Sequence, residues 1–427
     1  MKTAFRKDVA AWCLFDFANS SYTTLIITVA FSVYFREAVV HAADNTGDRL
    51  WGIANFLASA ITALLSPLLG AAADYSGRKK AFLVALTLQT VVFTALLATV
   101  GPGAIFWGIL CYVVATVGFE AGYVFYNAFL PDVADARNVG RVSGWAWAIG
   151  YVGGLCSLLL CYPLLKRPLL AGGAIDAAAV ADRQVAFLVV AGFFLIFALP
   201  AFLWLRESAP QGERPRGLAA YVSVGFRRVR QTLAHLRDYR DVARFILASV
   251  FFTDGITTVI AFSAIYATVT FGFSPQDLIV LFLVLNVIAF PGAAAAGHLA
   301  DRIGAKRTIV LSLFLWIGVV LVGAAASSRA AFWVMAVGAA IGMGSTQAVG
   351  RSFMAQITPP DRESEFFGFY VLAGKFASMF GPLLFGIVSD ATGSQKWAVL
   401  SLLPFFLVGL AFMARIDETR ARSRRTA

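Results

Sequence analysis

The sequence predicts an all-α membrane protein with twelve transmembrane helices arranged as two pseudo-symmetric bundles of six. Three observations support this fold class: 59% of the 427 residues are hydrophobic, only 14% are charged, and the apolar residues gather in long runs. A soluble domain carries about 25% charged residues, and a membrane span needs about 20 mostly apolar residues. The composition therefore excludes a cytosolic enzyme and a secreted disulfide scaffold.

Twelve apolar runs are long enough to cross a bilayer, and each is expected to form one span. In chain order they occupy residues 9–35, 50–73, 81–100, 104–130, 141–165, 184–205, 243–269, 277–299, 308–327, 330–357, 365–389 and 397–414. The first run is too long and too polar for a cleaved signal peptide, so we expect it to remain as the first span. The four cysteines lie inside apolar runs without zinc-type spacing, which indicates packing residues.

Lysine and arginine are distributed unevenly between the loops, and this bias predicts the orientation. If the N-terminus is inside, the inner segments hold 26 of the 35 basic residues and the outer segments hold seven. Both termini are therefore expected to face the cytoplasm, in a multi-pass protein of the cell (inner) membrane. The net charge of +11 is scattered over the inner loops, so it does not indicate nucleic-acid binding.

A basic stretch divides the twelve spans into two sets of six. The predicted parts are an N-terminal bundle at 1–205, a cytoplasmic linker at 206–243, a C-terminal bundle at 244–415 and a cytoplasmic tail at 416–427. Within the linker, apolar residues recur every three or four positions from Leu218 to Leu236, with arginines between them. This pattern is typical of a basic helix on a membrane surface, and an ordinary solvated linker helix is the alternative.

Two motifs with the same spacing end spans two and eight, 227 positions apart. Their residues are Gly70, Asp74, Gly77 and Arg78 in the first motif, and Gly297, Asp301 and Gly304 in the second. Parallel halves of this kind are one known architecture of secondary transporters, with the binding site near the bilayer midplane between them.

The Gly-x-x-x-Asp-x-x-Gly-Arg-Lys loop after span two resembles the signature of the major facilitator superfamily, which also recurs after span eight. Three further motifs, WCLFDFANSSY at 12–22, FYNAFLPD at 125–132 and RVSGWAW at 141–147, are similar to the vacuole-effluxer branch. The autophagy-related fungal members of that branch export amino acids from the vacuole. The resemblance implies a transporter that works by alternating access, with no cofactor, and not an enzyme.

The signature motif also has a physical interpretation. Its glycines permit a tight turn at a helix end, and its aspartate can lie against the N-terminus of another helix, where the macrodipole favours negative charge. The resemblance implies that Asp74 lies near the start of span eleven and Asp301 near the start of span five, where together they would close the cytoplasmic side. For basic residues such as Arg78, the alternative is that they only set the topology.

Five ionisable side chains lie well inside predicted spans, where a charge costs at least about 2.5–3.5 kcal/mol. They are Asp16, Glu120, Asp254, Arg351 and Lys375. Four of them lie in spans one, four, seven and ten, which the resemblance implies line a central cavity. Polar residues at helical spacing extend these positions: Asn19 and Thr23 in span one, Tyr123 and Asn127 in span four, Thr257 in span seven and Gln347 in span ten.

Each of these charges has two possible roles. Glu120 is expected to bind a substrate ammonium group or to carry a coupling proton, and the alternative is a structural hydrogen bond or an internal ion pair. Asp16 and Asp254 each have the same two alternatives, a functional role and a structural one. Arg351 is expected either to meet substrate or to join Asp301 in the gate, and Lys375 either to bind a substrate carboxylate or to act as a counter-ion.

The mixed charges favour a small polar or zwitterionic solute, such as an amino acid, over a neutral sugar. The predicted function is proton-coupled transport of such a solute by a monomer in the lipid bilayer. An exporter of amphipathic drugs or lipids is one alternative and suits the 38 phenylalanines. A membrane sensor or scaffold that does not transport is another. No metal site is expected, because the three histidines lack partner spacing.

Overall fold

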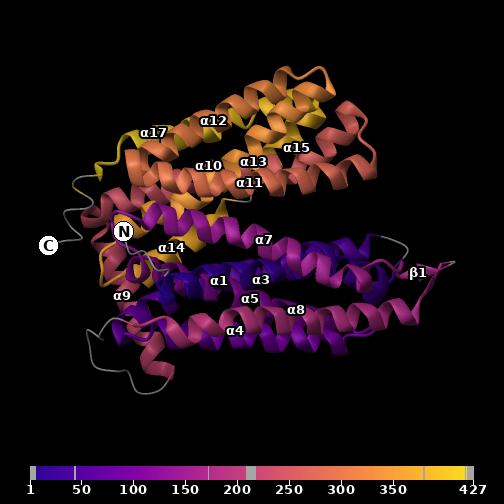
Figure 1. Ribbon diagram of the computed structural model, residues 1–427, viewed down its shortest axis with the longest axis horizontal. Coiled ribbons are helices and arrows are strands. Elements are labelled where there is room, and N and C mark those ends of the chain that lie inside the picture. The colour runs from indigo at the N-terminus through magenta and orange to yellow at the C-terminus, as the bar shows by residue number, and fades with distance from the viewer. Residues whose placement is uncertain are drawn as a thin grey trace. The chain divides into compact units, whose positions relative to one another are not determined.

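The computed structural model describes residues 6–42, 45–171, 173–207, 218–377, 380–418 and 420, and helices dominate them (Figure 1). Twelve stretches of this described chain are helical, long and apolar enough to cross a membrane, as the sequence predicts. Several begin earlier than their apolar runs: the sixth starts at Ala177 and the seventh at Leu236. A helix can continue past the hydrocarbon layer, where hydropathy no longer marks it.

Packing divides the chain into two compact units. Unit 1 comprises Met1–Ser66, Ala73–Val133 and Ile149–Arg214, and unit 2 comprises Pro67–Ala72, Ala134–Ala148 and Pro215–Ala427. The division falls within two helices, α3 (Thr46–Ser76) and α7 (Val139–Leu165), because one segment of each packs with unit 2.

Unit 1 is a helical bundle with an aromatic core. Besides parts of α3 and α7, its elements are α1 (Lys7–Ser21), η1 (Tyr22–Val29), α2 (Phe31–Tyr34), η2 (Phe35–Val40), α4 (Lys79–Leu96), η3 (Leu97–Thr99), α5 (Ile105–Ala128), α6 (Leu130–Val133), the strands β1 (Leu170–Ala171) and β2 (Ala174–Ile175), and α8 (Ala177–Trp204). The Tyr126 ring of α5 stacks on Trp12 and Phe15 of α1, with centroid distances of 4.6 and 4.8 Å. The Trp12 indole also donates to the Tyr126 carbonyl oxygen at 2.8 Å. These contacts fix α1 on α5.

The first span is not a uniform α-helix. Between α1 and α2 it passes through η1, a π-helical segment in which each turn holds more residues than an α-turn. Positions further along η1 are therefore increasingly rotated relative to regular α-helical spacing. The side chain of Thr23 is exposed, whereas Asp16 and Asn19 are buried.

Unit 2 contains the remaining helices. They are α9 (Leu218–Ala234), η4 (Leu236–Tyr239), α10 (Arg240–Phe271), α11 (Pro275–Ile303), α12 (Ala305–Ala325), α13 (Arg329–Ile357), α14 (Glu363–Phe376), α15 (Phe380–Thr392), α16 (Gln395–Leu400) and α17 (Leu403–Ala414). Helix α13 packs between α11 and α12, and α10 packs along α17. The eleventh span consists of two helices, α14 and α15, and Pro382 lies in the first turn of α15, where a proline is tolerated.

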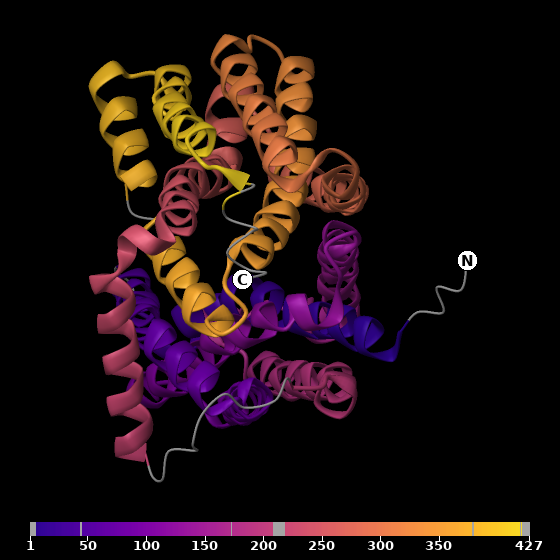
Figure 2. The ribbon, with the colours of Figure 1, turned by 90° about the vertical axis from the view of Figure 1, so that its left-hand side faces the viewer.

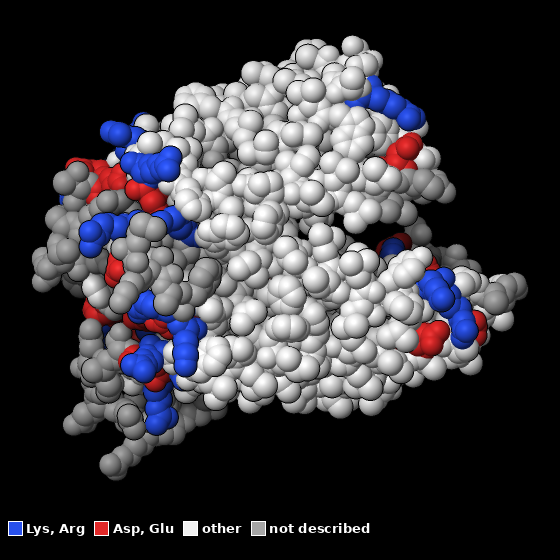
Figure 3. All heavy atoms as spheres, in the orientation of Figure 1, with Lys and Arg blue, Asp and Glu red and all other residues white. Residues whose placement is uncertain are grey.

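The surface is that of a protein embedded in lipid. Charged side chains gather near the helix ends, and a broad uncharged band covers the middle of the helices (Figure 3). Large apolar side chains are exposed along the spans, among them Leu64 and Leu159 at 71% and Phe106 at 79%. Such contiguous apolar exposure is unfavourable in water and marks a membrane-contacting surface.

Small residues allow α7 to approach α1 closely in unit 1. A Cβ added at Gly153 would overlap the backbone of Phe17, and one at Gly150 would lie 3.0 Å from the Ser20 hydroxyl oxygen. Close backbone approach of this kind drives helix association where no hydrophobic effect acts between helices.

Replacing Gly153 with alanine should therefore destabilise unit 1. A methyl group pressed against rigid backbone costs about 1–3 kcal/mol, so the Gly153→Ala protein should unfold at a lower temperature in detergent. Gly192→Ala is the matched control, since a Cβ there meets nothing within 4 Å and alanine in a helix is favoured over glycine by about 0.5–1 kcal/mol. Equal melting temperatures for the two variants would contradict this packing.

Candidate functional site

The second signature motif places a carboxylate at the start of α7. Asp301 Oδ1 accepts from the Gly140 amide at 2.8 Å, and Oδ2 accepts from the Arg141 amide and from Arg141 Nε, both at 3.0 Å. The first amides of a helix have no partner within it, and the dipole there favours an anion. Asp301 therefore caps α7, the fifth span, from α11, and this is the location that the sequence leads us to expect.

The glycines around Asp301 make this cap possible. A Cβ at Gly144 would lie 2.6 Å from the Ala293 carbonyl oxygen, and one at Gly297 would overlap the backbone of Gly140. Gly304 ends α11 with a φ of 98°, a conformation that L side chains rarely adopt. The motif spacing thus brings two backbones together and holds the carboxylate within reach of the helix start.

Arg351 lies on the same helix start from the other side. Its side chain is buried, and it donates from Nε to Ser143 Oγ and from Nη2 to the Ser143 carbonyl oxygen, both at 3.0 Å. Ser143 in turn donates to the Ala348 carbonyl oxygen at 2.6 Å. The guanidinium also lies 5.6 Å from the centre of the Trp147 ring. Helix α13 is thereby bonded to the first turns of α7.

The first signature motif ends α3. A Cβ at Gly70 would overlap the backbone of Ser364, so α3 touches the first turn of α14 within unit 2. Asp74 follows one turn later and is half-buried, and Gly77 closes the helix with a φ of 62°. Arg78 is exposed.

The lysine after Arg78 makes specific contacts, which a residue that only sets the membrane topology would not need. Lys79 is buried, and its Nζ pairs with Asp132 Oδ2 at 2.9 Å and donates to the Ala128 carbonyl oxygen at 3.4 Å. Asp132 closes the FYNAFLPD motif. The two sequence motifs are therefore bonded to each other inside unit 1.

Glu120 belongs to a buried polar cluster in unit 1. The hydroxyls of Tyr22 and Thr116 are 2.8 Å apart, and Tyr112 donates to Asn55 Oδ1 at 2.7 Å. Both tyrosines are fully buried, and the Glu120 carboxylate acts electrostatically on both hydroxyls. We call these five residues the Glu120 cluster. They come from three spans, through η1, α3 and α5.

Sequence reasoning missed Asn55 and Tyr112. A signal for Tyr112 was present, because Tyr112, Thr116 and Glu120 recur every four residues and share one helical face. Asn55 stands alone in an apolar run, so its partner could not be inferred without knowing which span packs against it.

Three further predicted residues of unit 1 lie on α1 and α5. Tyr123 stacks on Tyr126 at 5.5 Å, and Asn127 is buried. Asp16 is buried and faces α7. A Cβ added at Gly150 of α7 would lie 3.7 Å from the Cβ of Asp16, and Tyr151 lies within electrostatic range of the Asp16 carboxylate.

Asp254 caps a helix within unit 2. It is buried on α10, and its two carboxylate oxygens lie 2.9 and 3.0 Å from the Gly381 amide at the start of α15. Thr257 turns back to its own helix and donates to the Thr253 carbonyl oxygen at 2.9 Å. Gln347 on α13 and Lys375 on α14 are both half-buried.

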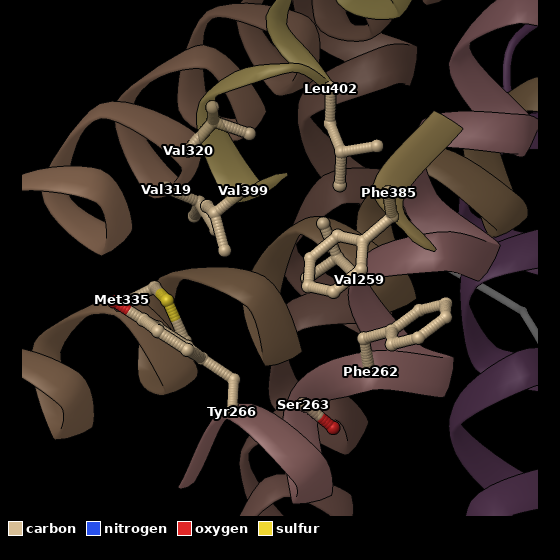
Figure 4. A pocket seen from close by; sticks show the side chains of 10 residues that line it. All are labelled: Val259, Phe262, Ser263, Tyr266, Val319, Val320, Met335, Phe385, Val399 and Leu402. Carbon is tan, nitrogen blue, oxygen red and sulfur yellow. The ribbon is translucent and has the colours of Figure 1, made fainter. Parts of the chain in front are cut away.

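A small apolar void lies elsewhere in unit 2 (Figure 4). Its volume is about 20 Å³, and its lining is apolar apart from Ser263 and Tyr266. The Tyr266 hydroxyl donates to the Gly323 carbonyl oxygen at 2.7 Å, so its polarity is satisfied. The void lacks all the predicted site residues and is a packing gap, too small for a solute larger than a water molecule.

Known proteins identify the family. The model of the vacuole effluxer Atg22 like family matches residues 53–426. The chain belongs to this family. The uncharacterised MFS-type transporter YxiO of Bacillus subtilis is 31% identical over 422 residues, which are 98% of this chain and 96% of that protein. Autophagy-related protein 22-1 of Neosartorya fischeri is 26% identical over 304 residues, which are 66% of this chain and 49% of the fungal protein. The chain therefore spans about half the length of that fungal relative.

Solved structures agree on the fold of this Atg22-like chain. The human organic anion transporter MFSD10 matches with a TM-score of 0.75 at 15% identity, over 96% of this chain and 100% of that one. The proton:xylose symporter XylE also gives 0.75, at 14% identity, over 97% and 96%. The protein is thus a multi-pass MFS-type transporter of the Atg22-like branch, and not an enzyme.

Removing the Asp301 carboxylate should loosen the start of α7. Loss of a helix cap costs about 1–2 kcal/mol, and 1.4 kcal/mol is a factor of ten in an equilibrium. In Asp301→Ala, amide hydrogen exchange of residues 139–144 should therefore quicken about tenfold. Asp390→Ala is the control, because Asp390 is an exposed acid of the same unit. Unchanged exchange at the start of α7 would mean that the cap contributes little.

Proposed function

We propose that this transporter moves a small zwitterionic, amino-acid-like solute across the cell membrane by alternating access, coupled to protons. The Glu120 cluster carries the proposal. Glu120 lies in the middle of a span, within electrostatic range of the buried Tyr22 and Tyr112 hydroxyls. Ionisable groups are rare at this depth and mark substrate or proton pathways. A substrate ammonium group or a proton would neutralise Glu120, and the surrounding hydroxyls can donate or accept as its charge changes.

The substrate carboxylate needs a cation. Arg351 donates to Ser143 at the start of α7, and these bonds favour a gate role for it over substrate contact. Lys375, half-buried on α14, is then the proposed ligand of the carboxylate, with Gln347 as a further polar contact. The other proposed members of the cavity are Asp16, Asn19, Thr23, Tyr123, Asn127 and Thr257.

The gate consists of the helix-start contacts. Asp301 and Arg351 hold the first turns of α7, and Gly70 lies against the first turn of α14. Alternating access would require these contacts to break each time the cytoplasmic side opens, while the bundles at 1–205 and 244–415 move about the linker at 206–243. The excess of basic residues in the inner segments supports cytoplasmic termini.

Proteoliposome flux tests the proposal. A panel of radiolabelled amino acids should contain at least one that accumulates when a pH gradient is imposed, and Glu120→Gln should lower that uptake about tenfold or more. Glu37→Gln is the control, since Glu37 is an exposed acid of the same unit, at the end of the first span.

Three results would count against the proposal. Absence of proton-dependent flux across the whole panel would remove the amino-acid substrate. Strong inhibition or thermal stabilisation by hydrophobic cations would favour the exporter of amphipathic compounds. A cellular phenotype that survives both Glu120→Gln and Asp74→Asn would favour a sensor or scaffold.

A further inference from the structure

Helix α9 in unit 2 has two distinct faces. One face is turned inward: Val224 and Thr232 are buried, and a Cβ at Gly225 would lie 2.6 Å from the Leu68 carbonyl oxygen of α3. The other face is apolar and exposed, with exposed fractions of 48% for Val222 and 60% for Phe226. An amphipathic helix ordinarily hides its apolar side in the protein, so the exposed side requires an explanation.

The inward face is bonded to the start of α14. The Thr232 hydroxyl donates to Glu365 Oε1, and Arg362 Nη1 donates to the Thr232 hydroxyl oxygen at 2.6 Å. Both Thr232 and Glu365 are buried. Arg228 adds a bond to the Asp361 carbonyl oxygen at 3.3 Å. We call these five residues the α9 docking cluster.

The outward face combines apolar and cationic side chains. Leu233 extends the exposed apolar stripe beyond Phe226, and Leu236, in the η4 segment that follows α9, is exposed as well. Arg230 follows Phe226 by four positions on α9, so it lies along the edge of the stripe, and Arg237 lies in η4. Both are exposed, as is Arg227.

The direction of α9 suits a membrane surface. Figure 2 shows α9 along its length, while the spanning helices of unit 2 are foreshortened, so the axis of α9 is steeply inclined to these spans. A basic amphipathic helix with this inclination can run in the plane of the membrane interface. There, apolar side chains enter the acyl boundary and arginines contact the headgroups.

We propose that the outward face of α9 binds the anionic headgroups of the surrounding membrane, and that the α9 docking cluster passes this binding to the first turn of α14. Charge favours lipid over a second copy or another protein, because the exposed arginines complement acidic headgroups. The same face carries exposed apolar side chains, Val222 and Phe226, that can enter the acyl boundary. Anionic lipid thereby fixes the position of α9, and the hydrogen bond from Thr232 to Glu365 links α9 to α14.

The consequence for transport rests on the proposed gate, because the start of α14 also touches Gly70. Stabilising α14 would favour the closed cytoplasmic side. The lipid contact and its transmission can be measured without any substrate, so their failure and the failure of the proposed function are distinguishable.

The first measurement locates lipid next to α9. In a Cys156→Ser background, which removes an exposed thiol, Val222→Cys is labelled with an environment-sensitive fluorophore in nanodiscs that contain spin-labelled quencher lipid. Quenching at position 222 should exceed that at the control Gln231→Cys, an exposed position on the polar side, and should rise when phosphatidylglycerol replaces phosphatidylcholine. Replacing Arg227, Arg230 and Arg237 with glutamine should lower the lipid preference about fivefold per arginine, and replacing them with lysine should retain it.

The second measurement follows transmission. Phosphatidylglycerol should slow amide exchange at residues 361–368 in the wild type and leave it unchanged in Thr232→Val, which keeps the shape but loses the bridging hydroxyl. Equal quenching at positions 222 and 231, or a lipid effect that persists in the glutamine variant, would overturn the lipid site. Cross-linking between copies through Phe226→Cys without quenching would replace it with a protein interface. A lipid effect on exchange that persists in Thr232→Val would overturn the transmission.

Discussion

The first amides of a helix lack partners within it, and in a bilayer no water replaces them. In unit 2, two such helix starts receive carboxylates from other helices: Asp301 bonds to α7, and Asp254 bonds to α15. Losing either carboxylate leaves amide groups unsatisfied, and losing either helix start leaves a buried anion unpaired. These bonds therefore have few intermediate geometries, which suits a protein that must alternate between discrete states.

The geometry of the signature motif serves the Asp301 bonds. Gly297 lets α11 approach α7 until Asp301 reaches the first amides, and Gly304 ends the helix immediately afterwards. In the first half of the chain, the lysine that follows the motif is used as well, because Lys79 pairs with Asp132. The basic residues of this loop fit the positive-inside rule, and at least one of them also forms a specific ion pair.

The structure distinguishes three of the five ionisable residues that composition treats alike. Asp254 is bonded to a backbone amide and Arg351 to Ser143, so both have clear packing roles. Glu120 instead lies among hydroxyls contributed by different spans. That difference is the physical basis for assigning substrate or proton chemistry to Glu120, and gate or structural roles to the other two.

Hydropathy and spacing are local properties, so the sequence alone could predict the twelve spans and the repeated motif, while the resemblance of its motifs to a known family implied the location of Asp301. The sequence could not predict the partners of Asp254, Tyr112 or Thr232, because each partner lies on a helix distant in sequence, and only packing decides which helices meet. The exposure of Thr23 also required the structure, because spacing along one helix does not show which neighbouring helices cover a side chain. Local pattern determined the elements, and tertiary packing decided which polar groups they bring together.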